Sequence, residues 1–129
     1  MRRFPTLLLL LLLAAAMSVS AQQGSDPSWV APDKDSARTN PFAGKTELAA
    51  GGQKVFSRSC AACHGDEAHR ASTKAPDLGS EAVQAESDGA LFWKITNGNT
   101  RKAMPSWGSL PEPQRWQLVL YIRSLREKK

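Results

Sequence analysis

Apolar residues recur with helical spacing in three stretches of the chain, whereas no stretch alternates apolar and polar residues as a strand does. The first stretch begins near Thr46, a suitable capping residue. Its stripe consists of Leu48, Gly52, Val55, Phe56 and Ser59. The second covers about residues 87–96, with Ser87 or Asp88 as its cap, and the third covers about residues 113–126. The pattern predicts an all-α fold with three main helices.

The first 21 residues form a segment of a different kind. Arg2 and Arg3 give it a charged start, residues 7–19 are a largely apolar run, and small residues close it at Ala21. This run is shorter than the roughly 20 residues that a helix needs to cross a bilayer. We predict that residues 1–21 are a secretory signal peptide and that the protein is periplasmic, without stable membrane insertion after cleavage. A retained segment that anchors the protein is the alternative.

Residues 22–44 lack an apolar period and contain three prolines among small and charged residues. This composition is typical of loops and linkers. We therefore predict a flexible leader over residues 22–44 and a single domain over residues 45–129. Trp29 and Phe42 are the leader residues best suited to dock a partner.

Length and charge narrow the class of protein further. Cleavage after Ala21 would leave 108 of the 129 residues, which is enough for one domain. The full chain has 17 basic and 12 acidic residues, so loss of Arg2 and Arg3 lowers the net charge from +5 to +3. Such a mild excess does not favour nucleic-acid binding. We expect no nucleic-acid partner, and at most a partner with an acidic surface.

The reactive side chains gather in one short motif, Cys60-Ala61-Ala62-Cys63-His64. C-x-x-C-H is the attachment pattern of a c-type haem. Two thiols separated by two residues can reach the two vinyl groups of one porphyrin, and the histidine that follows then projects its imidazole toward the iron. The motif predicts one covalently bound haem c, attached through Cys60 and Cys63 and ligated by His64.

Three other interpretations of the cysteine pair remain open. A C-x-x-C pair also serves thiol–disulfide exchange, but that chemistry is usually built on a βαβ unit, and the chain shows no strand pattern. A structural zinc site needs four ligands, and His69 is the one further candidate beside the motif. A structural disulfide is possible in a secreted protein, although so short a loop would constrain the unfolded chain little.

Residues 45–127 resemble a bacterial monohaem class I c-type cytochrome. In that family a glycine eight residues and an aromatic residue four residues before the first haem cysteine pack against an aromatic residue of the last helix. Gly52, Phe56 and Tyr121 stand at these positions. The resemblance implies a cytochrome c fold with three main helices around the haem, and it explains a glycine that would otherwise only weaken its helix.

The resemblance also implies the surroundings of the iron. Pro76 stands twelve residues after His64, where the family places a proline whose carbonyl accepts a hydrogen bond from the other ring nitrogen of the histidine. Met104 precedes Pro105, which favours extended backbone, and matches the loop methionine that is the sixth ligand in the family. We expect His64 and Met104 as axial ligands. His69 is the rival of Met104.

The implied function follows from the ligand set. An iron with both axial positions filled by protein has no site for substrate, so we expect an electron carrier that cycles between Fe(III) and Fe(II), and no enzyme. Its partners would be redox proteins: a dehydrogenase, an oxidase or another cytochrome. A monomer is favoured. The alternative is a cytochrome subunit tightly bound in a periplasmic dehydrogenase or oxidase complex, and a gas sensor or peroxidase would need a displaceable sixth ligand.

An apolar wall is expected to exclude water from the haem. Its predicted members are Leu48, Val55, Phe56, Leu78, Leu91, Phe92, Trp93, Ile95, Trp107, Leu118, Tyr121 and Ile122.

Overall fold

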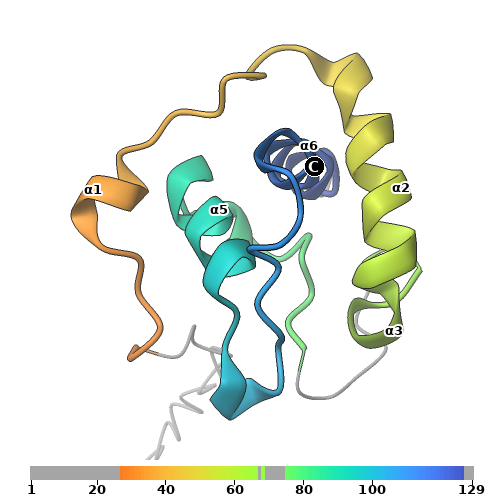
Figure 1. Ribbon diagram of the computed structural model, residues 1–129. Helices are drawn as coiled ribbons and strands as arrows, with labels where there is room; N and C mark the ends of the chain where they lie inside the picture. The colour runs from red at the N-terminus through yellow and green to blue at the C-terminus, as the bar shows by residue number, and fades with distance from the viewer. Residues whose placement is uncertain (1–26, 67, 69–74, 127–129) are drawn as a thin grey trace, which may run out of the picture.

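The computed structural model describes residues 27–66, 68 and 75–126 of the chain (Figure 1). The predicted signal peptide of residues 1–21 and the rival ligand His69 lie outside the described residues. Within the described ranges, no helix is both long enough and apolar enough to span a membrane.

The described residues are helical with connecting loops, and the one β-type contact among them is an isolated antiparallel bridge between Asn99 and Met104. The prediction of an all-α fold is therefore confirmed. The elements are α1 (Asp33–Ser36), η1 (Thr46–Leu48), α2 (Ala49–Ser59), α3 (Ala61–His64), α4 (Glu81–Gln84), α5 (Asp88–Asn97), η2 (Thr100–Lys102) and α6 (Glu112–Ser124). The three predicted helices correspond to α2, α5 and α6.

Local sequence explains where the long helices begin and end. The Ser87 hydroxyl accepts a hydrogen bond from the backbone N–H of Ala90 over 3.1 Å, so Ser87 caps α5 as expected. Gly98 ends that helix with a φ of 65°, a conformation that favours glycine. The predicted first helix begins with a 3₁₀ turn, η1, before α2 proper.

α6 lies at the centre of the molecule, with α2 on one side and α5 on the other (Figure 1). α2 crosses α6 at Gly52, because a methyl group added at Gly52 would lie 2.0 Å from the backbone oxygen of Gln117. One turn further, the rings of Phe56 and Tyr121 pack 5.0 Å apart between their centroids. The predicted packing of Phe56 on Tyr121 is therefore present, and Gly52 meets α6 at the backbone of Gln117 and Leu118.

The core lies where these helices meet. Its buried members are Val55, Phe56, Ala61, Ala68, Leu78, Leu91, Phe92, Ile95, Trp116, Leu118, Val119, Tyr121 and Ile122. Most residues predicted to wall the haem belong to this core, whereas Leu48, Trp93 and Trp107 are half-buried. The sequence pattern missed Trp116, whose ring stacks on Phe92 with 4.0 Å between centroids.

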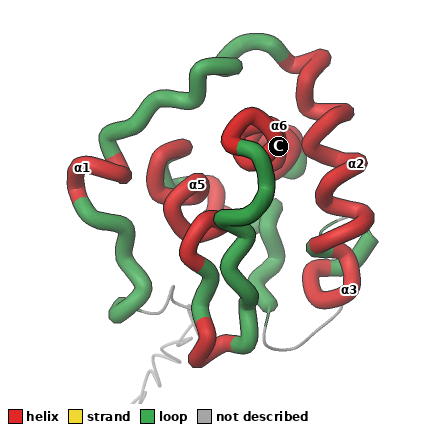
Figure 2. Tube along the Cα trace, in the orientation of Figure 1, coloured by secondary structure: helices red, strands yellow, loops and turns green. Residues whose placement is uncertain are grey.

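Residues 27–44, which we name the strap, include α1 beside α5 and then lead across to the start of α2 (Figure 2). Ala31 is 4% exposed and Asn40 is 2% exposed, and the Asn40 side-chain amide donates to the backbone oxygen of Trp116 over 3.1 Å. A methyl group added at Gly89 of α5 would lie 2.1 Å from the backbone oxygen of Asp35. The part of the predicted leader that the structure describes therefore packs on α5 and α6.

Candidate functional site

Cys60 separates α2 from the short helix α3, and Cys63 lies within α3. Both are free thiols, Cys60 half-buried and Cys63 exposed. Burial, with a smaller contribution from the neighbouring Cys63, raises the pKa of the Cys60 thiol to about 11. Redox C-x-x-C motifs have cysteines whose pKa values are lowered, so the raised pKa does not favour thiol–disulfide exchange here.

His64 ends α3, and its ring faces the loop that follows the undescribed residues 69–74. Nδ1 lies 3.4 Å from the backbone oxygen of Pro76, at the long end of the hydrogen-bonding range. In the tautomer with its proton on Nδ1, His64 donates to that oxygen and keeps the lone pair of Nε2 for a metal. Burial lowers the pKa of His64, with the Pro76 contact opposing it, so the neutral form that binds metals is favoured.

Gln84 positions the loop that carries Pro76. Its buried side-chain amide donates to the backbone oxygens of Leu78 and Ile122, both over 2.8 Å, and so ties the loop to α6. Close packing strengthens the same junction, because a methyl group at Gly79 would lie 2.7 Å from the backbone oxygen of Leu125. The position of the Pro76 oxygen is thus set by contacts that are distant in sequence.

Met104 lies in a tight loop at the end of α5. Asn99 and Met104 exchange two backbone hydrogen bonds of 2.8 and 2.9 Å, which close residues 99–104 into a hairpin-like turn around η2. Ala103 completes the turn with a φ of 59°. The backbone of Met104 is extended, as Pro105 predicts, and its side chain is half-buried.

The residues after Met104 are fixed to the end of α5. The Ser106 hydroxyl donates to the backbone oxygen of Thr96 over 2.6 Å. The backbone N–H of Trp107 donates to the backbone oxygen of Ile95 over 3.0 Å. Arg115 of α6 donates to the Thr96 hydroxyl over 2.6 Å. The Met104 loop is therefore held by both α5 and α6, and it lies toward the same end of the molecule as α3 (Figure 1).

The amide nitrogen of Asn99 is buried and, among the described residues, has no hydrogen-bond partner. Asn99 and Met104 are directly opposed across the bridge, so their side chains project to the same face. A buried donor of this kind needs an acceptor, which a bound group beside Met104 would supply. The sequence analysis missed Asn99, because an Asn-Gly-Asn stretch signals only the end of a helix.

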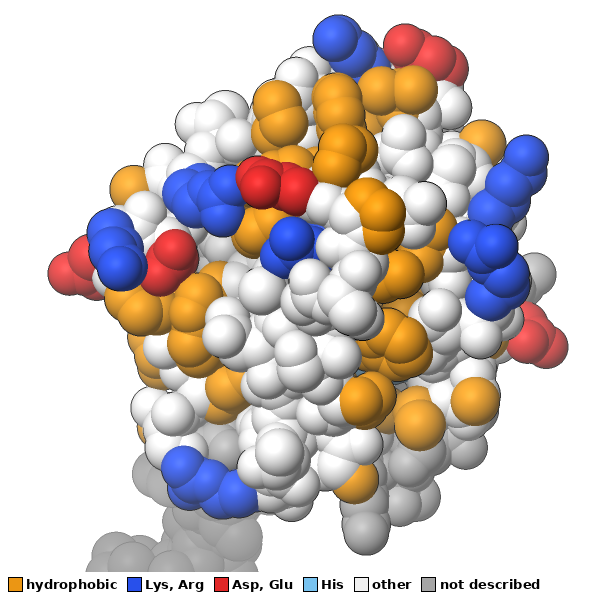
Figure 3. All heavy atoms as spheres, in the orientation of Figure 1, with side chains coloured by type: hydrophobic (Ala, Val, Ile, Leu, Met, Phe, Trp, Pro, Cys, Tyr) orange, Lys and Arg blue, Asp and Glu red, His pale blue; other side chains and the backbone are white. Residues whose placement is uncertain are grey.

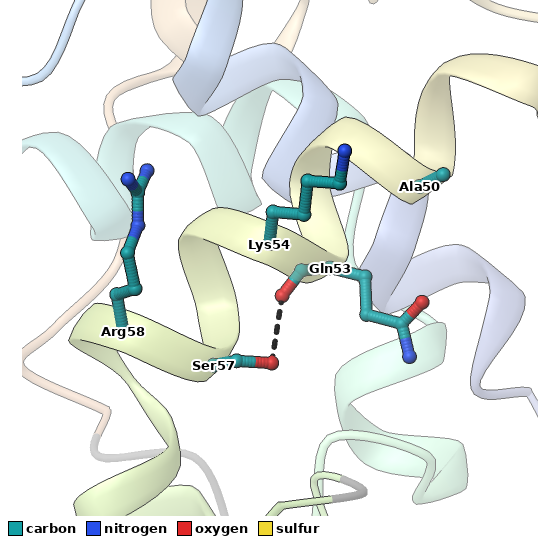
Figure 4. A pocket seen from close by; sticks show the side chains of 5 residues that line it. All are labelled: Ala50, Gln53, Lys54, Ser57 and Arg58. Carbon is teal, nitrogen blue, oxygen red and sulfur yellow. Dashed lines mark hydrogen bonds between the residues drawn. The ribbon is translucent and has the colours of Figure 1, made fainter.

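A shallow depression of about 500 Å³ lies elsewhere, on the outer face of α2. It is lined by Ala50, Gln53, Lys54, Ser57 and Arg58 (Figure 4). Basic side chains gather on this flank of the molecule (Figure 3). Because its residues lie on the side of α2 opposite the buried Phe56, the depression is solvated helix surface separate from the cysteines and Met104.

Residues 47–122 match the family described as cytochrome c oxidase, cbb3-type, subunit III, over more than half of the chain. The chain belongs to this family. It is 35% identical over 81 residues to the cbb3-type cytochrome c oxidase subunit FixPc of Rhizobium leguminosarum bv. viciae. It is 38% identical over 80 residues to subunit FixP of Bradyrhizobium sp. (strain ORS 278). Each match covers 60% of this chain, but the chain spans only 28% and 27% of these relatives.

Solved c-type cytochromes share the fold. Cytochrome CL from the marine methylotrophic bacterium Methylophaga aminisulfidivorans superposes with a TM-score of 0.56 at 23% identity, over 67% of this chain and 58% of that protein. The KustC0563 c-type cytochrome gives 0.52 at 23% identity, over 59% of this chain and 98% of that protein. The prediction of a cytochrome c fold is therefore confirmed.

The family fixes the cofactor class. A c-type cytochrome binds haem c covalently, so the cofactor of this chain is haem c and the chain is an electron-transfer cytochrome. The residues present fit this group: two free thiols at the attachment spacing, an imidazole with Nε2 available, and an unpaired buried donor beside a methionine.

Proposed function

We propose that the chain is a periplasmic carrier of single electrons, with Cys60 and Cys63 attaching one haem c. His64 and Met104 serve as the axial ligands. The observation that carries this proposal is the contact between His64 Nδ1 and the Pro76 oxygen, because it leaves Nε2 as the metal-binding nitrogen. Met104 is the one methionine after the predicted signal peptide.

When bound, haem c supplies an iron that alternates between Fe(III) and Fe(II). The Pro76 carbonyl orients the His64 ring and raises the donor strength of Nε2. The Met104 thioether favours Fe(II) and so raises the potential. The apolar core beside α3 excludes water, which also tunes the potential. With both ligand positions occupied by side chains, no position remains for a substrate, and this favours a carrier over an enzyme.

Acid–organic extraction of the purified holoprotein tests the attachment. Colour should stay with the polypeptide, and a pyridine haemochrome spectrum should report haem c. Replacement of either cysteine by alanine should give at best a singly attached, poorly matured product. Recovery of free haem, or of none, would exclude covalent attachment at these residues.

Met104→Ala tests the sixth ligand. The oxidised wild type should show the weak red charge-transfer band of Fe(III)–sulfur bonding and, when reduced, should resist carbon monoxide. The variant should lose the band, bind carbon monoxide and have a lower midpoint potential. His69→Ala is the control and should change none of these. The reverse pattern would establish a bis-histidine ligand set.

A second candidate function is a cytochrome subunit held permanently in an oxidase complex. The observation that favours it is the likeness to FixP and FixPc, which are subunits of cbb3-type oxidases. Native gels and size-exclusion chromatography of membrane and periplasmic fractions would distinguish a free carrier from an oxidase subunit. A free carrier elutes from the periplasmic fraction near its monomer mass, whereas a subunit co-elutes with oxidase activity.

A further inference from the structure

The strap reaches the loop of Met104 through Trp29. The indole Nε1–H of Trp29 donates to the backbone oxygen of Gly98 over 2.8 Å, although the two residues are 69 positions apart in the sequence. Trp29 is half-buried, so this hydrogen bond is partly shielded from water. A side chain that precedes the helical core thus contacts the loop at the far end of α5.

The acceptor, Gly98, is part of the structure that fixes Met104. A methyl group at Gly98 would lie 2.5 Å from the backbone carbonyl of Pro105, so its backbone packs directly against the residue after Met104. The next residue, Asn99, exchanges two hydrogen bonds with Met104. Movement of Met104 away from its position therefore disturbs the peptide group that Trp29 holds.

The indole of Trp29 is itself held in place. The Lys94 ammonium lies 4.7 Å from the centroid of its ring, and the same ammonium pairs with Glu86 over 2.6 Å. Both members of that pair are largely buried, with side-chain exposures of 10% and 20%. Further along the strap, the Asn40 side-chain amide donates a hydrogen bond to the backbone of α6. Trp29 is thus a fixed donor on an anchored segment.

We propose that Trp29 is a positioning residue for the sixth iron ligand. Through the Gly98 oxygen, it holds residues 99–104 closed, so that the Met104 sulfur stays on the iron and small external ligands are kept out. The proposal rests on the proposed function, because it requires Met104 to ligate the iron. It gives the strap a role in the chemistry of the site that is independent of any partner.

The test is the rate at which imidazole replaces the sixth ligand in the oxidised holoprotein. Trp29→Phe keeps an aromatic ring beside Lys94 but removes the indole N–H, together with the second ring of the indole. We expect the charge-transfer band of Fe(III)–sulfur bonding to persist and substitution to become roughly 3- to 10-fold faster, the range that corresponds to loss of one hydrogen bond. Val30→Ala is the matched control, because Val30 is the exposed neighbour in the strap, and it should leave the rate unchanged.

Hydrogen exchange of the Asn99 and Met104 amides gives a second measurement, since both form the bridge. Exchange should accelerate in Trp29→Phe and not in Val30→Ala. If the wild type shows the sulfur band but Trp29→Phe changes neither rate, the role of Trp29 is overturned while the ligation by Met104 stands. If the wild type lacks the band and takes up imidazole as fast as Met104→Ala, the ligation itself fails, and the role of Trp29 fails with it.

Discussion

Two buried glycines mark two different kinds of contact in this molecule. At Gly52, a methyl group would lie 2.0 Å from the backbone of α6, and at Gly89, one would lie 2.1 Å from the backbone of the strap. The first contact joins two long helices, each with a continuous apolar stripe. The second joins a helix to a segment held mainly by single polar and aromatic contacts. The two backbone approaches are equally close, but different interactions hold them.

The difference is visible in what surrounds each glycine. Around Gly52 lie Val55, Phe56 and Leu118, all at most 3% exposed. Around Gly89, the Ser87 hydroxyl donates to the Ser36 oxygen over 2.7 Å, and the Arg38 guanidinium lies 4.6 Å from the centroid of the Phe92 ring. Apolar burial supports the helix crossing, whereas hydrogen bonds and cation–π contacts support the strap. We expect the crossing of α2 and α6 to be rigid, and the strap to detach from α5 first when the protein is destabilised.

Gly52→Ala should have the largest effect. Its methyl group would lie 2.0 Å from the carbonyl oxygen and 2.5 Å from the carbonyl carbon of Gln117, so α2 and α6 must separate. Overpacking of this kind costs about 1–3 kcal/mol, occasionally more, in the free energy of unfolding. Denaturant titration of the holoprotein measures it.

Gly51→Ala is the matched control for that measurement. Its methyl group would meet the end of the Gln117 side chain, at 2.6 Å, and a flexible side chain can move aside. The substitution also gains roughly 1 kcal/mol of helix propensity. Gly51→Ala should therefore be neutral or stabilising, and equal losses in the two variants would show that α2 and α6 do not cross at Gly52.

Gly89→Ala should have a smaller global effect, because the strap can move away from α5 without opening the core. The helix propensity that alanine gains, roughly 1 kcal/mol, offsets part of the cost. We expect a loss of no more than about 1 kcal/mol in unfolding free energy, together with faster tryptic cleavage at Lys34 and Arg38. Gly51→Ala serves again as control. Cleavage at the wild-type rate would show that the strap does not depend on this close approach.

The same contrast explains what could be predicted from the sequence. The three long helices, the cap at Ser87 and the contact of Gly52 with α6 follow from apolar spacing and from a family pattern in which each residue has a fixed offset. Such signals are local or periodic. Helix boundaries still shifted by a few residues, because the first turn before α2 is 3₁₀.

The strap, Gln84 and Asn99 gave no such signal. The strap and Gln84 make contacts with partners distant in sequence, as Gln84 does with Ile122 and Trp29 with Gly98. The side-chain nitrogen of Asn99 is buried without a partner among the described residues. A polar residue among prolines looks like a linker residue unless its distant partner is known. At the site, the motif predicted the cysteines and His64 as a group. The buried donor beside Met104 emerged only from the fold.

The smallest effect expected is a pH dependence at the outer edge of the strap. Hydrogen bonds from the Trp116 indole and the Arg38 guanidinium lower the pKa of Glu112 below its usual value, although the carboxylate is exposed. Arg115, on the next turn of α6, acts in the same direction, and the position of Glu112 in the first turn of α6 also favours its charge.

The sign follows from linkage. A carboxyl whose pKa is lowered by folding contributes stability that is present above its unfolded pKa and is lost as the pH falls through its folded pKa. Glu112→Gln removes the titrating group and keeps an acceptor for Trp116. Between pH 6 and pH 3, the denaturation midpoint of the wild type should therefore fall slightly more than that of the variant, with the two curves meeting at the acid end. Because water and salt screen an exposed pair, the difference should shrink further in high salt. Parallel curves across this range would show that the Arg38–Glu112 pair contributes nothing to holding the strap on α6.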